Sequence, residues 1–150
     1  RRQRQMCIRD RYYGEGYQAK NYNEKTNYYR VQKLLEKAES GNDITIGVIG
    51  GSMTAGANAE PMETNCYGAR LKTWFESTFG IDVNFINIGI GSTNSYFGCI
   101  RAEEKLLRFN PDLIIIEYAC NDQLEDIYLD SYESLIRKCW KTRVSQPLYR

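Results

Sequence analysis

Residues 44–54 read ITIGVIGGSMT, and this stretch decides the fold of the chain. The apolar and β-branched run 44–49 is typical of a strand buried on both faces, as in a parallel sheet. Gly50 and Gly51 then allow a sharp turn and close packing of the backbone. Ser52 follows at once, just beyond the carboxyl end of the strand, where open α/β sheets bind their ligands. This is the logic of a nucleophile elbow, although the sequence is not Gly-x-Ser-x-Gly.

The rest of the chain alternates between helical and extended patterns. Apolar residues at helical spacing predict helices at about 27–40, 65–79 and 95–108, and another around 132–140. Further strands are predicted at 83–88 and 112–118, with a polar loop at 55–64. A helix followed three times by a strand and a helix predicts a parallel sheet with helices on both faces.

The large apolar side chains of these helices are expected to form their buried faces. In the helix at 65–79 they are Tyr67, Leu71, Trp74, Phe75 and Phe79. In the helix at 95–108 they are Tyr96, Ile100, Leu106 and Leu107, and Trp140 is expected to pack in the same way in the last helix.

Composition argues against several classes of protein. The 150 residues carry a formal net charge of +1, which argues against nucleic-acid binding. No apolar run approaches the roughly 20 residues of a membrane span, and no signal peptide is visible. Five cysteines without a Cys-x-x-Cys pair, and no histidine, argue against a zinc site. Scattered single cysteines fit a reduced compartment, so a cytoplasmic location is favoured.

The first eleven residues are treated separately. Residues 1–11 are basic and show no hydrophobic period, and residues 6–11 resemble one reading frame of a sequencing adapter. We expect them to be a non-native or disordered basic tail.

Three predicted strand-to-helix turns each carry a small polar residue, namely Ser52, Ser92 and Asn121. In a parallel sheet the three turns lie at the same edge. A hydroxyl nucleophile needs donors that stabilise a developing oxyanion. Ser52 is the candidate nucleophile. Its own backbone N–H, the N–H of Gly91 or Ser92, and the side-chain amide of Asn121 are the candidate donors.

The neighbours of these residues are interpreted as structural. Asp122 is expected to brace its turn, because Asp and Asn commonly hydrogen-bond within turns. Arg101 is expected to be a structural hydrogen-bond donor or a surface charge, and Cys120 a small packing residue.

These turns resemble three sequence blocks of the SGNH or GDSL hydrolases, a family of serine esterases and lipases. The first block, usually Gly-Asp-Ser, is similar to residues 50–54, and a subgroup with Gly-Gly-Ser-x-Thr is closer still. The second block resembles residues 87–93, and the third, Gly-x-Asn-Asp, resembles residues 119–122 with alanine in place of glycine. Each block alone is weak, but the three occur in the right order, each after a predicted strand, within a similarity that runs from about Tyr28 to Lys138.

The resemblance implies a three-layer α/β/α sandwich of flavodoxin-like type, with a parallel sheet truncated after about three strands. Residues 12–150 would form the N-terminal portion of this single domain. The family's strand order places the second strand outermost, then the first, then the third. Residues 113–116 would then form an exposed apolar edge through which copies of the chain associate.

The resemblance also implies site roles. It assigns Ser52 as the nucleophile, Asn121 as an oxyanion donor, and the backbone N–H of Ser92 as a second donor, with Gly91 as the choice after a one-residue shift. No cofactor is expected. The family's fourth block, Asp-x-x-His, supplies the base and its orienting acid, and it is absent because the chain has no histidine. By analogy the substrate is an acetyl ester of a carbohydrate or a similar small ester, and this chain alone is expected to be poorly active.

Two other functions stay open at this point. The first is a nucleotide-binding module, because the segment 89–94 is almost a dinucleotide fingerprint between a strand and a helix. It lacks the third glycine and a clear acidic residue after the next strand, and residues 47–54 lack the lysine of a P-loop. The second is an inactive glycan-binding or interaction protein derived from a hydrolase.

Overall fold

The computed structural model describes residues 24–123 and 125–144. Contacts divide the chain into two units, Arg1–Lys33 and Leu34–Arg150. The sheet and the helices that cover it belong to the second unit, and helix α2 (Glu24–Glu39) crosses the division. The expectation for residues 1–11 lies outside the described residues.

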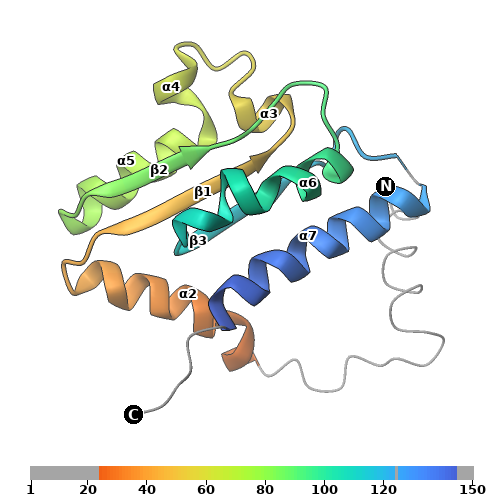
Figure 1. Cartoon of the computed structure of the whole chain (residues 1–150). Coiled ribbons are helices and arrows are strands. Elements are labelled where there is room, and N and C mark those ends of the chain that lie inside the picture. Colours follow the sequence, from red (N-terminus) through yellow and green to blue (C-terminus); the bar gives the residue numbers. More distant parts are fainter. Residues whose placement is uncertain (1–23, 124, 145–150) are drawn as a thin grey trace. The chain divides into compact units, whose positions relative to one another are not determined.

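Three parallel strands form the sheet, as the alternation of elements predicted (Figure 1). They are β1 (Ile44–Gly50), β2 (Val83–Asn87) and β3 (Leu113–Glu117), in the order β2-β1-β3. Val48 of β1 pairs with Asn87 on one side and with Ile115 on the other. β1 is therefore the central strand, and it is buried along its length except at Thr45. The expected strand order is confirmed.

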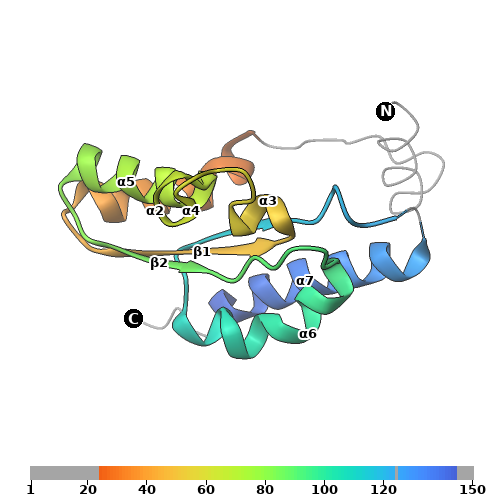
Figure 2. The ribbon, with the colours of Figure 1, turned by 90° about the horizontal axis from the view of Figure 1, so that it is seen from above.

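Helices cover both faces of this sheet (Figure 2). α5 (Tyr67–Phe79) and the second half of α2 pack on one face, while α6 (Ser95–Lys105) and α7 (Asp126–Val144) lie on the other. The connections contain α3 (Ser52–Ala55), α4 (Met62–Asn65) and a 3₁₀ turn, η1 (Leu107–Phe109). α4 falls inside the polar loop expected at 55–64. The three layers confirm the predicted α/β/α sandwich.

Each face of the sheet has its own hydrophobic core. The core on the α5 face consists of Leu34, Ala38, Ile44, Ile46, Val48, Phe75, Ile81 and Val83. The core on the α6 and α7 face consists of Ile49, Ala102, Leu106, Leu107, Tyr118, Leu135 and Cys139. The strands supply residues to both cores because successive side chains of a strand point to opposite faces.

Helix α6 buries small residues rather than the large ones that its sequence pattern indicated. Gly98 and Ala102 are buried, whereas Tyr96 and Ile100 are 51% and 60% exposed, so the predicted face was wrong at these two positions. The reason is a close approach at Gly98. A Cβ atom there would lie 2.6 Å from two ring carbons of Tyr118. The helix can lie this close to the end of β3 only because the side chain is missing.

The two tryptophans also lie outside the cores, contrary to the prediction. Trp74 is 48% exposed and Trp140 is 55% exposed. The ring of Trp74 is nearly perpendicular to those of Phe75 and Phe79, with ring centres 4.9 Å and 5.8 Å away. Trp74 therefore covers the outer rim of the core on the α5 face, and edge-to-face contacts of this kind stabilise aromatic clusters.

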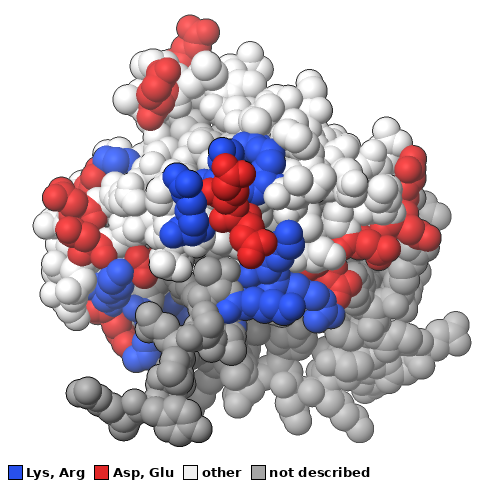
Figure 3. Space-filling model, viewed as in Figure 1, with Lys and Arg blue, Asp and Glu red and all other residues white. Residues whose placement is uncertain are grey.

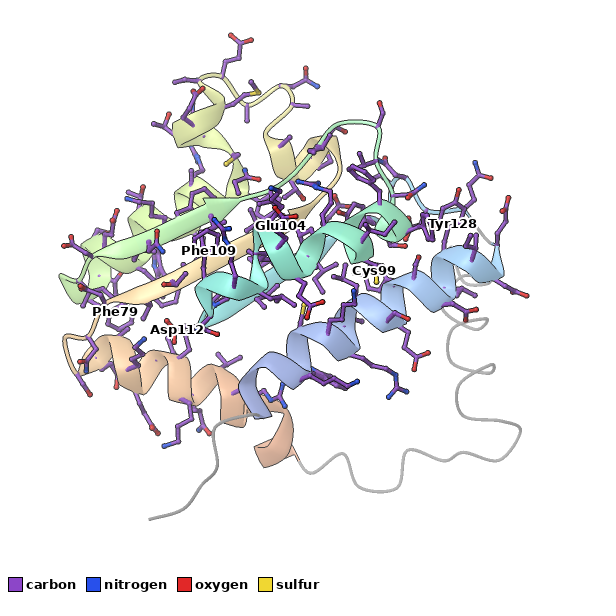
Figure 4. The ribbon with its side chains drawn as sticks, viewed as in Figure 1. Phe79, Cys99, Glu104, Phe109, Asp112 and Tyr128 are labelled. Carbon is purple, nitrogen blue, oxygen red and sulfur yellow. The ribbon has the colours of Figure 1, made fainter. Side chains whose placement is uncertain are left out.

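Polar contacts join α6 to α7. Ser95 Oγ, buried at the start of α6, lies 2.7 Å from Ser131 Oγ and 3.2 Å from the carbonyl oxygen of Tyr128. Farther along, Lys138 Nζ donates to the carbonyl of Cys99 at 3.0 Å. Figure 4 shows Cys99 on α6 and Tyr128 on α7, the two helices that these contacts join. They fix where α6 begins, and therefore where the turn before it lies.

Tyr118 offers a test of this packing. Its side chain is 0% exposed, and its hydroxyl has no hydrogen-bond partner in the part of the chain that the structure describes. We expect Tyr118→Phe to leave the free energy of unfolding at pH 7 unchanged or to raise it by up to about 1 kcal/mol, because an unsatisfied buried polar group is removed. Urea unfolding of both proteins measures the difference. A clear loss of stability at pH 7 would show instead that the hydroxyl is hydrogen-bonded.

The same substitution should change the response to alkali. Burial raises the pKa of Tyr118 from its ordinary 10.0 to about 12. A group whose pKa is raised on folding contributes stability below its unfolded pKa, and that contribution is lost as the pH rises through the folded value. Between pH 10 and 12 the wild-type chain should therefore lose more stability than Tyr118→Phe, as urea unfolding across this range would show.

Candidate active site

The turn after β1 brings Ser52 to the carboxyl edge of the sheet. β1 ends at Gly50 and α3 begins at Ser52, so Gly51 alone connects them. The Gly51 N–H donates to the carbonyl of Glu117, the last residue of β3, at 3.1 Å. Ser52 is half-buried. Its side chain is thus placed by a rigid strand and remains accessible from the edge of the sheet.

Asn121, in the turn after β3, lies against this elbow. A Cβ atom at Gly51 would lie 2.6 Å from Asn121 Nδ2. Asn121 Nδ2 donates to the carbonyl of Thr93 at 2.5 Å, and its backbone N–H donates to the carbonyl of Tyr118 at 3.0 Å. An amide nitrogen carries two hydrogens. The Thr93 bond engages one of them, and the described residues provide no acceptor for the other.

The turn after β2 forms the third side of the site. The Ile90 N–H donates to the Gly50 carbonyl at 3.1 Å, which continues the ladder beyond the end of β2. A Cβ atom at Gly91 would lie 3.9 Å from the Cβ of Ser52. Ser92 is exposed and has a left-handed backbone, with φ of 59°. The structure therefore places Gly91 next to Ser52, and Ser92 one residue farther along.

Asp122 joins the second and third turns. Its Oδ1 accepts the Ser95 N–H at 2.8 Å, at the start of α6, which agrees with the expected bracing role. Asn94 Oδ1 accepts the Phe97 N–H of the same helix at 3.1 Å. A dinucleotide would need its pyrophosphate on free N–H groups at this helix start. Side-chain oxygens already occupy two of them, so the geometry speaks against the nucleotide-binding hypothesis.

A partly buried hydrogen bond lies beneath the elbow. Thr54 is 1% exposed, and its Oγ1 lies 2.9 Å from the hydroxyl of Tyr67. Burial raises the pKa of the Tyr67 phenol, and the bond from Thr54 lowers it only in part. Tyr67 therefore stays neutral near pH 7, and the bond ties α3 to the start of α5.

The side of the rim formed by α3 and the segment after β2 carries little charge. Figure 3 shows Lys, Arg, Asp and Glu side chains intermixed over α6, whereas the surface over α3 and the segment after β2 is largely uncharged in this view. Apolar Met53 and Ile90 are 57% and 41% exposed beside Ser52 and Gly91. Arg101 donates to the carbonyl of Ile88 at 3.3 Å, which fits the structural role expected for it. Such a rim suits an uncharged substrate.

Residues 24–123 and 125–144 contain neither a cluster of metal-binding side chains nor a membrane-spanning helix. In this part of the chain no three His, Cys, Asp or Glu side chains gather closely enough to bind a metal ion. None of its helices has the length and apolar character needed to span a membrane.

Comparison with solved structures identifies the fold. A two-domain esterase active on acetylated mannans is 38% identical over 75% of this chain, with a TM-score of 0.72. The same type of esterase co-crystallised with mannopentaose gives 38% identity over 77% of this chain and a TM-score of 0.73. AlinE4, an SGNH-hydrolase family esterase, is 24% identical over 71% of this chain, with a TM-score of 0.50. The chain has the SGNH-hydrolase fold.

The chain covers only part of these structures. It spans 30% and 32% of the length of the two-domain esterase structures and 57% of AlinE4. No protein-family model matches the chain, and no curated protein matches it. The resemblance to the SGNH hydrolases that the three turns indicated is nevertheless confirmed by the structural comparison.

Within the SGNH fold, the sequence reasoning missed the residues that hold the turns together. Thr54 and Asn87 were given no role, although both stand inside the motifs that carried the resemblance. Tyr67 was expected on the buried face of its helix, but it is 36% exposed. A polar residue at the very end of a strand was the available signal for Asn87. Cys120 was expected to pack inside, but it is exposed beside Asn121.

Proposed function

We propose that this chain carries the nucleophile and the oxyanion donors of a serine esterase. The observation that supports it is the meeting of three turns, in which Asn121 Nδ2 contacts the elbow at Gly51 and Gly91 lies next to Ser52. Ser52 is the proposed nucleophile. The proposed donors are the Asn121 side-chain amide and the backbone N–H groups of Ser52 and of Ser92 or Gly91.

In the proposed reaction, Ser52 Oγ attacks the ester carbonyl carbon and loses its proton to a base. A carbon–oxygen bond forms, and the carbonyl π electrons move to the oxygen, which becomes an oxyanion held by the donors. The intermediate collapses, the alcohol leaves with a proton returned by the base, and an acyl-serine remains. Water then attacks the acyl group by the same route and releases the acid.

The base lies outside these residues in this proposal. The resemblance assigns it to a histidine in an Asp-x-x-His block, and the chain has no histidine. A carboxylate such as Glu117, which ends β3 near the elbow, is a poor substitute for the imidazole of a histidine, because a carboxylate is a much weaker base.

For the substrate we propose an acetyl ester of a carbohydrate. The two-domain esterase that is 38% identical to this chain acts on acetylated mannans. The largely uncharged side of the rim, with exposed Met53 and Ile90, fits a neutral sugar ester with a small apolar acyl group. The donors would bind an ester of a different small alcohol equally well. The proposal of a carbohydrate therefore depends on the similar esterase and on the rim of the site together.

The test uses a chimera in which residues 34–144 replace the matching segment of that two-domain esterase. We expect the chimera to release acetate from acetylated mannan, and Asn121→Ala to lower kcat by about a hundredfold to a thousandfold, the usual effect of removing one oxyanion donor. KM should change little, because the donor acts mainly on the transition state. Asn84→Ala, at an exposed position of β2, is the matched control.

The same assay distinguishes the esterase from the remaining alternative, an inactive glycan-binding protein. A folded chimera that binds acetylated mannan without releasing acetate would favour the glycan-binding protein. Equal rates for Asn121→Ala and Asn84→Ala would remove Asn121 from the proposed site.

A further inference from the structure

The side chain of Asn87 connects the first turn to the second. Asn87 is the last residue of β2. Its Nδ2 donates to the Thr54 carbonyl of α3 at 2.8 Å and more weakly to Cys66 Sγ at 3.8 Å, and its Oδ1 accepts the Gly89 N–H at 2.8 Å. Because the Thr54 carbonyl is an acceptor and the Gly89 N–H a donor, only one orientation of the amide satisfies both. The amide thus bridges the helix that begins with Ser52 and the turn that contains Gly91.

Helix α3 depends on this bond for its end. α3 has only four residues, Ser52–Ala55, and the carbonyls of residues 51–53 accept backbone N–H groups from residues 55–57. The next carbonyl, that of Thr54, accepts the Asn87 side chain instead. The last carbonyls of a helix need partners from outside it. Asn87 therefore completes the C-terminal end of the helix that presents Ser52.

The second turn lies directly on α3 at this point. A Cβ atom at Gly89 would lie 2.7 Å from the carbonyl carbon of Thr54 and closer still to the Ala55 nitrogen. The bonds from Asn87 to Thr54 and to Gly89 lie on either side of this contact, one on α3 and one on the turn. They prevent the turn from sliding along the helix, and Gly91 follows two residues after Gly89.

We infer that Asn87 is a positioning residue that sets the distance between Ser52 and the oxyanion donors of the second turn. The inference rests on the proposed function. Asn87 acts through Thr54 and Gly89 and does not act on the substrate itself. Its loss shifts the donors relative to the nucleophile, so the chemical step slows while the sugar binds as before.

Asn87→Asp is the sharpest test, because the side chain keeps its shape and loses the N–H groups that donate to Thr54 and Cys66. At pH 7 the new carboxylate can still accept the Gly89 N–H, but it turns an oxygen toward the Thr54 carbonyl, which it repels. We expect kcat of the chimera on acetylated mannan to fall by about tenfold to a hundredfold, as small displacements of reacting groups do. KM should stay within about twofold. Asn84→Asp adds the same charge to the same strand and should leave both values unchanged.

Protonation supplies a second readout. A protonated carboxyl group has an O–H that can donate to Thr54 and a C=O that can accept from Gly89. The kcat ratio of Asn87→Asp to wild type should therefore rise as the pH falls toward the ordinary carboxyl pKa of about 4. In the 150-residue chain itself, the deficit in melting temperature of Asn87→Asp should shrink over the same pH range. Asn84→Asp should show neither trend.

The outcomes separate this inference from the proposed function. If Ser52→Ala abolishes turnover but Asn87→Asp behaves like Asn84→Asp, the positioning role is wrong and the esterase site stands. If Ser52→Ala has no effect, the proposed function fails. If the deficit in melting temperature of Asn87→Asp does not change with pH, the bond to Thr54 is not the contribution of Asn87. If only KM changes, Asn87 acts in substrate binding instead.

Discussion

Ser52→Ala in the chimera should lower kcat for acetate release by about a millionfold, the loss seen when a serine hydrolase is deprived of its nucleophile. The reason is that alanine offers no atom that can form the acyl-enzyme, so only the oxyanion donors continue to help. A residual rate of about a thousandfold over the uncatalysed reaction is then expected from the donors and from binding.

Measurement needs a sensitive acetate assay and a matched serine control. Ser77→Ala on α5 removes a hydroxyl that donates to the nearby Trp74 carbonyl at 3.1 Å, and it should keep the full rate. If Ser52→Ala retains the rate of Ser77→Ala, Ser52 is not the nucleophile.

The isolated 150-residue chain belongs in the same experiment. It has no histidine, and a serine hydroxyl without a base is a weak nucleophile. Its hydrolysis of p-nitrophenyl acetate should therefore be at least about a thousandfold slower than that of the chimera, which shares Ser52 and the donors and in addition has a base. Comparable rates would reveal a base among these residues.

The second large effect that we expect is association between copies of the chain through strand β3. The Gly51 N–H reaches the Glu117 carbonyl across the sheet. Peptide groups alternate in direction along a strand, so those of Ile114 and Ile116 point away from β1. Within the described residues, β3 pairs with β1 and with no other strand. An apolar strand with unpaired peptide groups is a template for another chain, so light scattering should show dimers or larger species that grow with concentration.

One residue of α7 occupies a hydrogen-bonding group at this edge. The Tyr132 hydroxyl donates to the Ile116 carbonyl at 3.1 Å. Tyr132→Phe removes that donor and frees the carbonyl, so it should increase association. Ile114→Pro removes an outward N–H, which edge strands tolerate, and should decrease it. A monomer at every concentration for all three proteins would contradict pairing through β3.

Much of the arrangement was predictable from the sequence because its signals are local. The uninterrupted apolar run at 44–49 indicated a buried parallel strand, and the glycines after it indicated a turn. Parallel strands bring their turns to one edge, so the sequence order alone placed Ser52 and Asn121 together. The structure shows how near they are. Asn121 can lie this close to the elbow only because Gly51 has no side chain.

Other features depend on distances between elements, and a sequence pattern does not contain them. The prediction of the buried face of α6 was wrong at Tyr96 and Ile100, because it assumed that large apolar residues face the core. The close approach at Gly98 instead turns the small residues of the helix toward the core. Asn87 went unassigned because a single polar residue has no period. Its role depends on hydrogen bonds to backbone atoms of Thr54 and Gly89, which the sequence pattern does not reveal.

The contact between Gly89 and α3 has a consequence for changing substrate range by mutagenesis. The inner wall of the candidate site is main chain, and a side chain at Gly51 or Gly89 would collide with Asn121 or with α3. Substitution libraries aimed at the wall would therefore return mostly misfolded protein. Met53 and Ile90 stand 57% and 41% exposed beside the same wall. Diversity placed at these two positions can reshape the entrance for bulkier acyl groups while the backbone beneath it stays as it is.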